Sequence, residues 1–212
     1  MTGAVFCLHG LGRTPADWDG VRAGLGRFGD VRAPALPARQ REAVALLAPM
    51  VAAGDIVVGH SMGGVVAQLV GARVPYRALV LTGCFFPPAR NGRGLGQSLA
   101  DYAAHRVAYV RAVAGARGAR RQRAPGSMRA LAPLVRQALR GRAGRASPVL
   151  AGTPTLVVHA RDDHHVPVDF ALAAAAAHPA WRCAILPSGG HHAHVEHPDE
   201  WLAAVSPWLD AN

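Results

Sequence analysis

Short apolar runs of strand length alternate along the chain with segments of helical length, and this alternation limits the fold more than any other feature of the sequence. Six such runs predict strands, at Ala4–Leu8, Asp30–Pro34, Asp55–Gly59, Arg77–Thr82, Thr155–His159 and Trp181–Leu186. The intervening segments predict helices at Arg41–Ala53, Gly63–Val74, Asp169–Ala177 and Pro198–Leu209, with the first kinked or shortened at Pro49. This order predicts an α/β fold, a mostly parallel six-stranded sheet with helices on both faces.

Length and composition exclude several classes of protein. The 212 residues are enough for one domain with a full core, and half of them are apolar, so a disordered chain is excluded. No apolar run reaches the roughly 18 residues of a membrane span. The first residues lack a basic region and do not read as a signal peptide. The three cysteines (Cys7, Cys84 and Cys183) are far apart and odd in number, which indicates a reducing compartment, and we expect a cytoplasmic protein.

Charge divides the chain into two parts. All 23 basic residues are arginine, and the net charge is +10. Residues 85–150 hold thirteen arginines and one acidic residue, Asp101, and so carry +12, whereas the rest of the chain holds ten arginines and twelve acids and carries −2. We therefore predict a core formed by residues 1–84 and 151–212, and an Arg-rich helical insertion, 85–150, between the fourth and fifth strands. Within it, Leu99–Val113 and Ser127–Leu139 have helical patterns.

Three interpretations of the Arg-rich insertion stay open. It can be a solvated surface that reflects a compositional bias, since the chain contains no lysine. It can dock an acidic carrier protein or the phosphates of a coenzyme A thioester, because arginine binds phosphate and carboxylate groups in a bidentate manner. Nucleic acid is the least favoured partner, because Tyr102 and Tyr109 are the main aromatic residues available for base stacking, and we expect none to bind. The oligomeric state is not indicated.

The segment Gly59–Gly64 (GHSMGG) has the pattern G-x-S-x-G. It lies directly after a predicted buried strand and directly before a predicted helix, the context that presents a serine hydroxyl on a sharp turn. The helix that follows directs its free N–H groups to the same place. The pattern therefore indicates that Ser61 is a nucleophile, whereas an ordinary serine in a glycine-rich turn is the alternative.

Residues that could assist this serine follow other predicted strands. His9 and Gly10 end the first strand, where a backbone N–H can complete an oxyanion hole. The segment Arg161–Pro167 (RDDHHVP) supplies a carboxylate after the fifth strand, and Gly190-His191 supplies a base after the sixth. The carboxyl ends of parallel strands meet at one edge of the sheet, so we expect these groups to converge.

With these residues, the chain resembles the α/β-hydrolase fold family, the lipases, esterases and thioesterases with a GHSMGG turn. The resemblance covers nearly all of the core and implies a reduced fold without the family's first two strands, with the insertion where a cap is usual. It implies a catalytic triad in family order, Ser61, Asp163 and His191. Family spacing favours Asp163 over Asp162, and the Gly-His pair favours His191 over His192.

The resemblance also implies the surroundings of the triad. The oxyanion hole would consist of the backbone N–H groups of Leu11 and Met62. Candidate residues of the substrate pocket are His9, Gly10, His60, Cys84, Phe85 and Val166.

The function expected on these grounds is that of a serine hydrolase that cleaves a small-molecule carboxylic ester or thioester through an acyl-enzyme on Ser61. Alternatives are a thioesterase acting on acyl groups that are attached to a carrier protein or coenzyme A, a C–C bond hydrolase, and a non-catalytic protein that binds a ligand on the same fold. No cofactor is expected. The histidines after the fifth and sixth strands are of a type that binds zinc, but one is required as a base and no acid lies in clear ligand register, so no metal is expected. His192, His194 and His197 are expected to be loop and surface residues near the pocket mouth.

Overall fold

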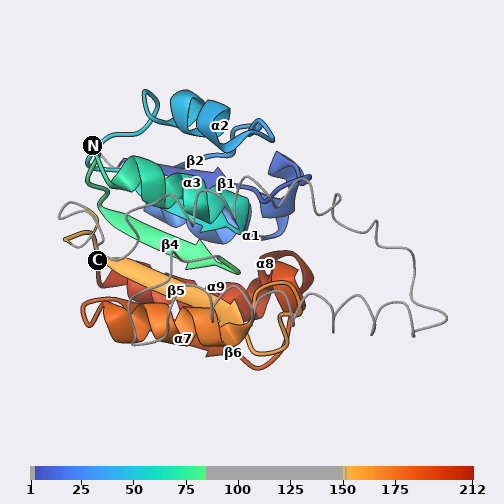
Figure 1. Cartoon of the computed structure of the whole chain (residues 1–212). Coiled ribbons are helices and arrows are strands. Elements are labelled where there is room, and N and C mark those ends of the chain that lie inside the picture. The colour runs from blue at the N-terminus through green and yellow to red at the C-terminus, as the bar shows by residue number, and fades with distance from the viewer. Residues whose placement is uncertain (1–2, 85–149, 151) are drawn as a thin grey trace, which may run out of the picture.

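The computed structural model describes residues 3–84, 150 and 152–212 (Figure 1). The predicted insertion, including both of its helices and the candidate pocket residue Phe85, lies outside this part of the chain, apart from Leu150. Within the described residues, no helix has both the length and the apolar character needed to cross a membrane.

All six predicted strands are present in one sheet. They are β1 (Ala4–Leu8), β2 (Asp30–Arg32), β3 (Ile56–His60), β4 (Ala78–Thr82), β5 (Thr155–Ala160) and β6 (Arg182–Leu186). Their order in space is β2-β1-β3-β4-β5-β6, and every neighbouring pair is parallel. The predicted parallel α/β sheet is therefore confirmed.

The helices follow the predicted alternation, and further short helices occur between the predicted ones. They are η1 (Pro15–Trp18), α1 (Asp19–Leu25), η2 (Gly26–Phe28), α2 (Gln40–Leu47), α3 (Met62–Gly71), α7 (Val168–Ala177), η3 (Gly190–His192), α8 (Ala193–Glu196) and α9 (Pro198–Asp210). Helix α2 ends at Leu47, just before Pro49, where the sequence predicted a kink or an early end. Helix α1 was not predicted, since two glycines in seven residues mask its helical pattern.

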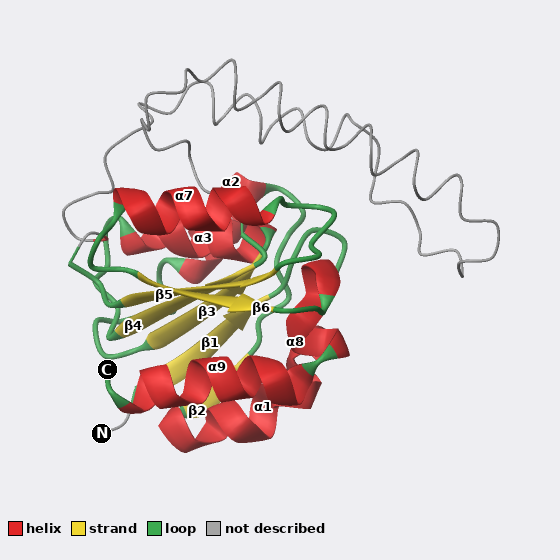
Figure 2. Ribbon diagram, turned by 90° about the horizontal axis from the view of Figure 1, so that it is seen from below, coloured by secondary structure: helices red, strands yellow, loops and turns green. Residues whose placement is uncertain are grey.

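Helices cover both faces of the sheet, as Figure 2 shows, with α2, α3 and α7 on one side and α1 and α9 on the other. Strand side chains alternate between the two layers. For example, Phe6 and Leu8 pack in the cluster that contains α3, whereas Val5 and Cys7 pack in the cluster that contains α9. The central strands are thus buried on both faces, which explains their continuous apolar sequences.

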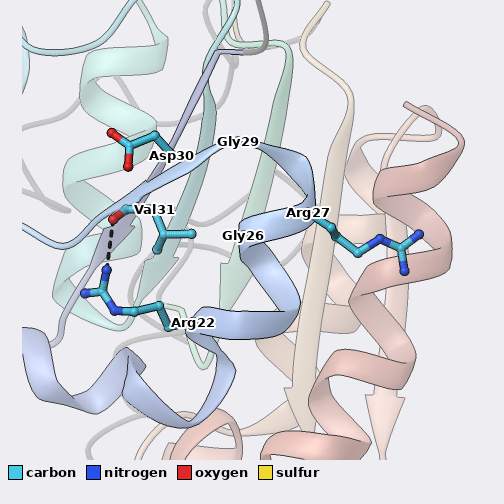
Figure 3. A pocket seen from close by; sticks show the side chains of 6 residues that line it. All are labelled: Arg22, Gly26, Arg27, Gly29, Asp30 and Val31. Atoms are coloured by element: carbon cyan, nitrogen blue, oxygen red, sulfur yellow. Dashed lines mark hydrogen bonds between the residues drawn. The ribbon is translucent and has the colours of Figure 1, made fainter.

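The amino and carboxyl ends of the strands differ in what lies beside them. A surface hollow of about 510 Å³ (Figure 3) lies beside Arg22, Gly26, Arg27, Gly29, Asp30 and Val31. Asp30 pairs with Ala4 at the start of β1, so this hollow is at the amino ends of the strands. The predicted chemical groups all follow the carboxyl ends, at the opposite edge. We therefore place the candidate site there rather than in the hollow.

Candidate active site

Ser61 occupies a strained turn between β3 and α3. Its φ of 51° and ψ of −116° make it the one non-glycine residue with positive φ in the described part of the chain. The turn is possible because glycines flank it: a Cβ on Gly59 would lie 2.5 Å from the Cα of Gly64, and a Cβ on Gly63 would lie 2.2 Å from the carbonyl oxygen of Leu8. The GHSMGG sequence therefore fits a turn that larger side chains would not allow.

The two residues expected to supply oxyanion donors, Met62 and Leu11, belong to segments next to this serine. Met62 is the first residue of α3, so its N–H has no acceptor within the helix. Leu11 lies in a turn closed by a 3.2 Å hydrogen bond from the N–H of Arg13 to the carbonyl of Gly10. A Cβ on Gly10 would come within 3.3 Å of the Ser61 Cβ, so this turn lies directly beside the serine.

Asp163 and His191 form a close pair at the same edge of the sheet. The Nδ1 of His191 donates a hydrogen bond of 2.8 Å to Oδ2 of Asp163, because an ionised carboxylate can only accept. The other oxygen, Oδ1, accepts from the backbone N–H groups of His165 (2.7 Å) and Val166 (2.9 Å). The carboxylate is fully buried and the imidazole nearly so. The pair is thus held in one orientation, in which Nδ1 of His191 is committed to the carboxylate.

A second histidine, His159 at the end of β5, also contacts Asp163. Its Nε2 donates to the Val166 carbonyl at 2.8 Å and lies 3.3 Å from Oδ2 of Asp163. Burial alone raises the pKa of the Asp163 carboxyl, but the hydrogen bond and charge of His191, the charge of His159 and the Val166 N–H together lower it below its ordinary value. Sequence reasoning missed His159; the available signal was a histidine in a buried strand four residues before the acid.

The structure distinguishes Asp163 from Asp162, and His191 from His192. Asp162 is exposed and accepts a hydrogen bond of 2.9 Å from the N–H of Gly190, so it holds the loop but does not contact the imidazole. His192 turns toward His60, with ring centroids 5.0 Å apart. Asp163 and His191 are therefore the carboxylate and imidazole that the fold brings into contact.

Three further pocket candidates, His9, Cys84 and Val166, have structural roles. His9 is buried, its Nδ1 donates to the Gly10 carbonyl (2.8 Å) and its Nε2 accepts from the N–H of Leu36 (2.9 Å), so both nitrogens serve the backbone. Cys84 is buried beneath the turn, with Sγ 3.5 Å from the Ser61 carbonyl oxygen. Val166 is also buried, and its main chain supports the carboxylate of Asp163. These three residues build the site and do not offer free polar groups to a ligand.

Next to His191 lies a group of three histidines, His60, His192 and His194, that we call the imidazole layer. His60 is fully buried, and its ring centroid lies 4.8 Å from that of His191 and 4.6 Å from that of His194. His194 was predicted to be a loop and surface residue; this is wrong, because its ring is buried between His60 and Trp18, the latter at 4.4 Å. His192 and His197 are half-buried.

Burial keeps the imidazole layer uncharged. Desolvation, with the neighbouring histidines, lowers the pKa of His60 well below its ordinary value. The same causes lower the pKa of His194 to about 3 and that of His192 to about 4, with Arg13 contributing in both cases. These rings are therefore neutral at pH 7.

Two groups in the described part of the chain bring three possible metal ligands within 4.8 Å of one another. They are Asp17, His60 and His194, and Asp163, His165 and His191. In the first, Arg13 binds both carboxylate oxygens of Asp17 at 2.6 and 2.9 Å, and in the second the acid and His191 bind each other. Both carboxylates already have cationic or hydrogen-bonding partners, so neither group is preorganised for a cation.

The sequence matches a family model described as the alpha/beta hydrolase family over residues 5–205. No curated protein matches the chain in sequence. Among solved structures, it is similar to an esterase from Rhodococcus sp. ECU1013, with 23% identity, coverage of 99% of this chain and 90% of that chain, and a TM-score of 0.63.

Two further structures agree with this fold. A pyrethroid hydrolase from Sphingobium faniae JZ-2 is 17% identical, with coverage of 100% and 98% and a TM-score of 0.66. A meta-cleavage product hydrolase from Pseudomonas fluorescens IP01 is 19% identical, with coverage of 99% and 92% and a TM-score of 0.65. These identities support the fold alone. The family model, which spans nearly the whole chain, shows that this protein belongs to the alpha/beta hydrolase family.

Proposed function

We propose that this protein is a serine hydrolase that cleaves a carboxylic ester through an acyl-enzyme on Ser61. The observation that carries the proposal is the buried Asp163–His191 pair at the same sheet edge as the strained Ser61 turn. Three groups that acyl transfer needs, a nucleophile, a base and an orienting acid, thus follow β3, β6 and β5.

The mechanism follows from the hydrogen bonds. Because Asp163 holds Nδ1 of His191 as the protonated nitrogen, Nε2 is the atom that can accept the Ser61 proton as the serine oxygen attacks the carbonyl carbon. The N–H groups of Leu11 and Met62 then stabilise the oxyanion. His191 returns the proton to the leaving alcohol, and water, activated by the same base, releases the acid and restores Ser61.

The comparisons support an ester substrate only by similarity, since the neighbours include an esterase and a pyrethroid hydrolase. A second candidate is a thioester carried by coenzyme A or an acidic carrier protein, which the charge of +12 on residues 85–150 favours. C–C bond hydrolysis is a further alternative, because meta-cleavage product hydrolases share the fold.

A fluorophosphonate probe tests the proposal directly. The purified protein should be labelled, and Ser61→Ala should lose all labelling while it keeps the melting temperature of the wild type or exceeds it, since alanine removes no buried partner. A well-folded wild-type protein that resists labelling would exclude the serine hydrolase and leave a ligand-binding role.

Salt dependence separates the two substrate classes. We expect hydrolysis of a coenzyme A thioester docked by the arginines of residues 85–150 to slow between low salt and 0.5 M NaCl, because salt screens charge contacts. Hydrolysis of a neutral short-chain nitrophenyl ester should not change. Equal salt responses for both substrates would exclude docking by the Arg-rich segment.

A further inference from the structure

We propose that His60 is a positioning residue that holds the catalytic base in place, an inference that rests on the proposed function. His60 ends β3 and directly precedes Ser61 in sequence. Its Nε2 donates a hydrogen bond of 2.9 Å to the main-chain carbonyl of His191. One short segment of the chain therefore presents the nucleophile and also binds the backbone of the base.

The backbone of His191 is supported from a second strand at the same point. Gly83 follows β4 with a φ of 53°, and a Cβ there would lie 3.1 Å from the carbonyl oxygen and 3.2 Å from Nδ1 of His191. The carbonyl that accepts the bond from His60 thus rests against the end of β4. Together with Asp163 after β5, three neighbouring strands fix the position of this residue, and His60 supplies the one side-chain hydrogen bond to its main chain among the described residues.

The tautomer of His60 follows from its partners. A carbonyl oxygen accepts, so the ring proton is on Nε2. Its Nδ1 is buried without a hydrogen-bond partner among the described residues, and it faces Gly10, where a Cβ would lie 2.9 Å away. A neutral imidazole needs one acceptor for its single N–H, and the carbonyl of His191 is that acceptor. Its burial and its packing against Gly10 preserve this arrangement.

His194 provides a matched comparison within the same layer. It is equally buried and packs against the His60 ring, yet neither of its nitrogens has a hydrogen-bond partner in the described part of the chain. If the imidazole layer served only to fill space, the two histidines would respond alike to replacement by phenylalanine. If His60 positions the base, only its replacement should reduce reactivity.

The test compares His60→Phe, His60→Gln and His194→Phe in the full-length protein. We expect His60→Phe to lower the rate of fluorophosphonate labelling, and kcat for a nitrophenyl ester, by about 10- to 100-fold with KM nearly unchanged, since a misplaced base affects the reaction step and not binding. His60→Gln keeps an N–H that can reach the carbonyl and should recover most of this loss. His194→Phe should label within about threefold of the wild type.

Normal labelling by a folded His60→Phe protein would overturn the proposal, and so would an equal loss in His60→Phe and His194→Phe. Hydrogen exchange provides a readout that does not require activity. The backbone amides of residues 189–193 should exchange faster in His60→Phe than in His194→Phe. If the wild type shows no labelling, the proposed function fails, but exchange still reports whether His60 holds the loop; unchanged exchange in His60→Phe would overturn the inference by itself.

Discussion

Two buried polar regions meet at the carboxyl edge of the sheet, and they are built in opposite ways. The carboxylate of Asp163 has contacts on both oxygens, from His191, His159 and two backbone N–H groups. In the imidazole layer, four ring nitrogens have no hydrogen-bond partner among the described residues: Nδ1 of His60, Nδ1 of His192, and both nitrogens of His194.

The difference follows from charge. A buried carboxylate is stable only when hydrogen bonds and cations replace the water it has lost, whereas an imidazole can give up its proton and remain neutral. Asp163 is therefore kept ionised by its partners, whereas burial and the neighbouring histidines keep the imidazole layer neutral. One region places a buried charge at the carboxyl ends of the strands, and the other places uncharged rings beside it.

The largest effect should come from removing the negative charge of the Asp163 carboxylate. Asp163→Asn should lower the fluorophosphonate labelling rate by about 10⁴-fold, because an amide does not favour the protonated Nδ1 of His191 or stabilise the imidazolium. Asp162→Asn is the matched control: its residue is exposed and adjacent, and it should stay within about twofold. A larger loss in Asp162→Asn than in Asp163→Asn would contradict the assigned pair.

As the pH falls, the stability that depends on the imidazole layer should be lost before the stability that depends on Asp163. Burial lowers the pKa of His194 to about 3 in the folded protein, against an ordinary value of 6.5. Between these two values the unfolded chain binds a proton at His194 and the folded protein does not. The free energy of unfolding is therefore highest above pH 6.5 and decreases as the pH falls toward 3. The loss is about 1.4 kcal/mol per pH unit for each such histidine. Asp163, whose pKa is lowered, adds stability that is lost only below its ordinary value of 3.8.

Urea unfolding at pH 6.5, 5.5 and 4.5 measures this dependence. The free energy of unfolding should fall across the series, and His194→Phe should reduce the slope by about 1.4 kcal/mol per pH unit. A free energy of unfolding that does not change between pH 6.5 and 4.5 would show that these histidines are protonated in the folded protein.

A smaller effect is expected from crowding the interface between His60 and the serine turn. Gly10→Ala should destabilise the fold by about 1–3 kcal/mol, because the new Cβ would lie 2.9 Å from Nδ1 of His60 and 3.3 Å from the Ser61 Cβ. Gly26→Ala, where a Cβ meets nothing within 4 Å and φ is −59°, should be neutral or slightly stabilising. Equal melting temperatures for the two variants would show that the space beside His60 can expand.

The sequence predicted the parts of this site that local rules determine. Glycines at fixed spacing indicated the turn at Ser61, and the parallel strand order indicated that groups after β5 and β6 converge. The choice of Asp163 and His191 came from resemblance to a family, and the structure places these two side chains in contact.

Packing between distant segments could not be predicted in the same way. His194 lies in a polar stretch that reads as a surface loop, and only its contacts with Trp18 and His60 bury it. His159 is part of a buried strand, and its role beside Asp163 depends on the turn that follows. Helix α1 is stabilised by burial of Val21 and Leu25, which offsets the low helix propensity of its glycines.

The order of strands in the sheet has a consequence for folding. Strands β1 to β4 end at Thr82 and pair among themselves, whereas β5, their next neighbour, begins at Thr155. Joining segments that are far apart in sequence is entropically costly, so we expect the β4–β5 pairing to be a late step of folding. Ser61 belongs to the early half, and Asp163 and His191 to the late half. A partly folded or still growing chain would therefore display the proposed nucleophile without the proposed base, and we expect it to remain unreactive until the two halves join.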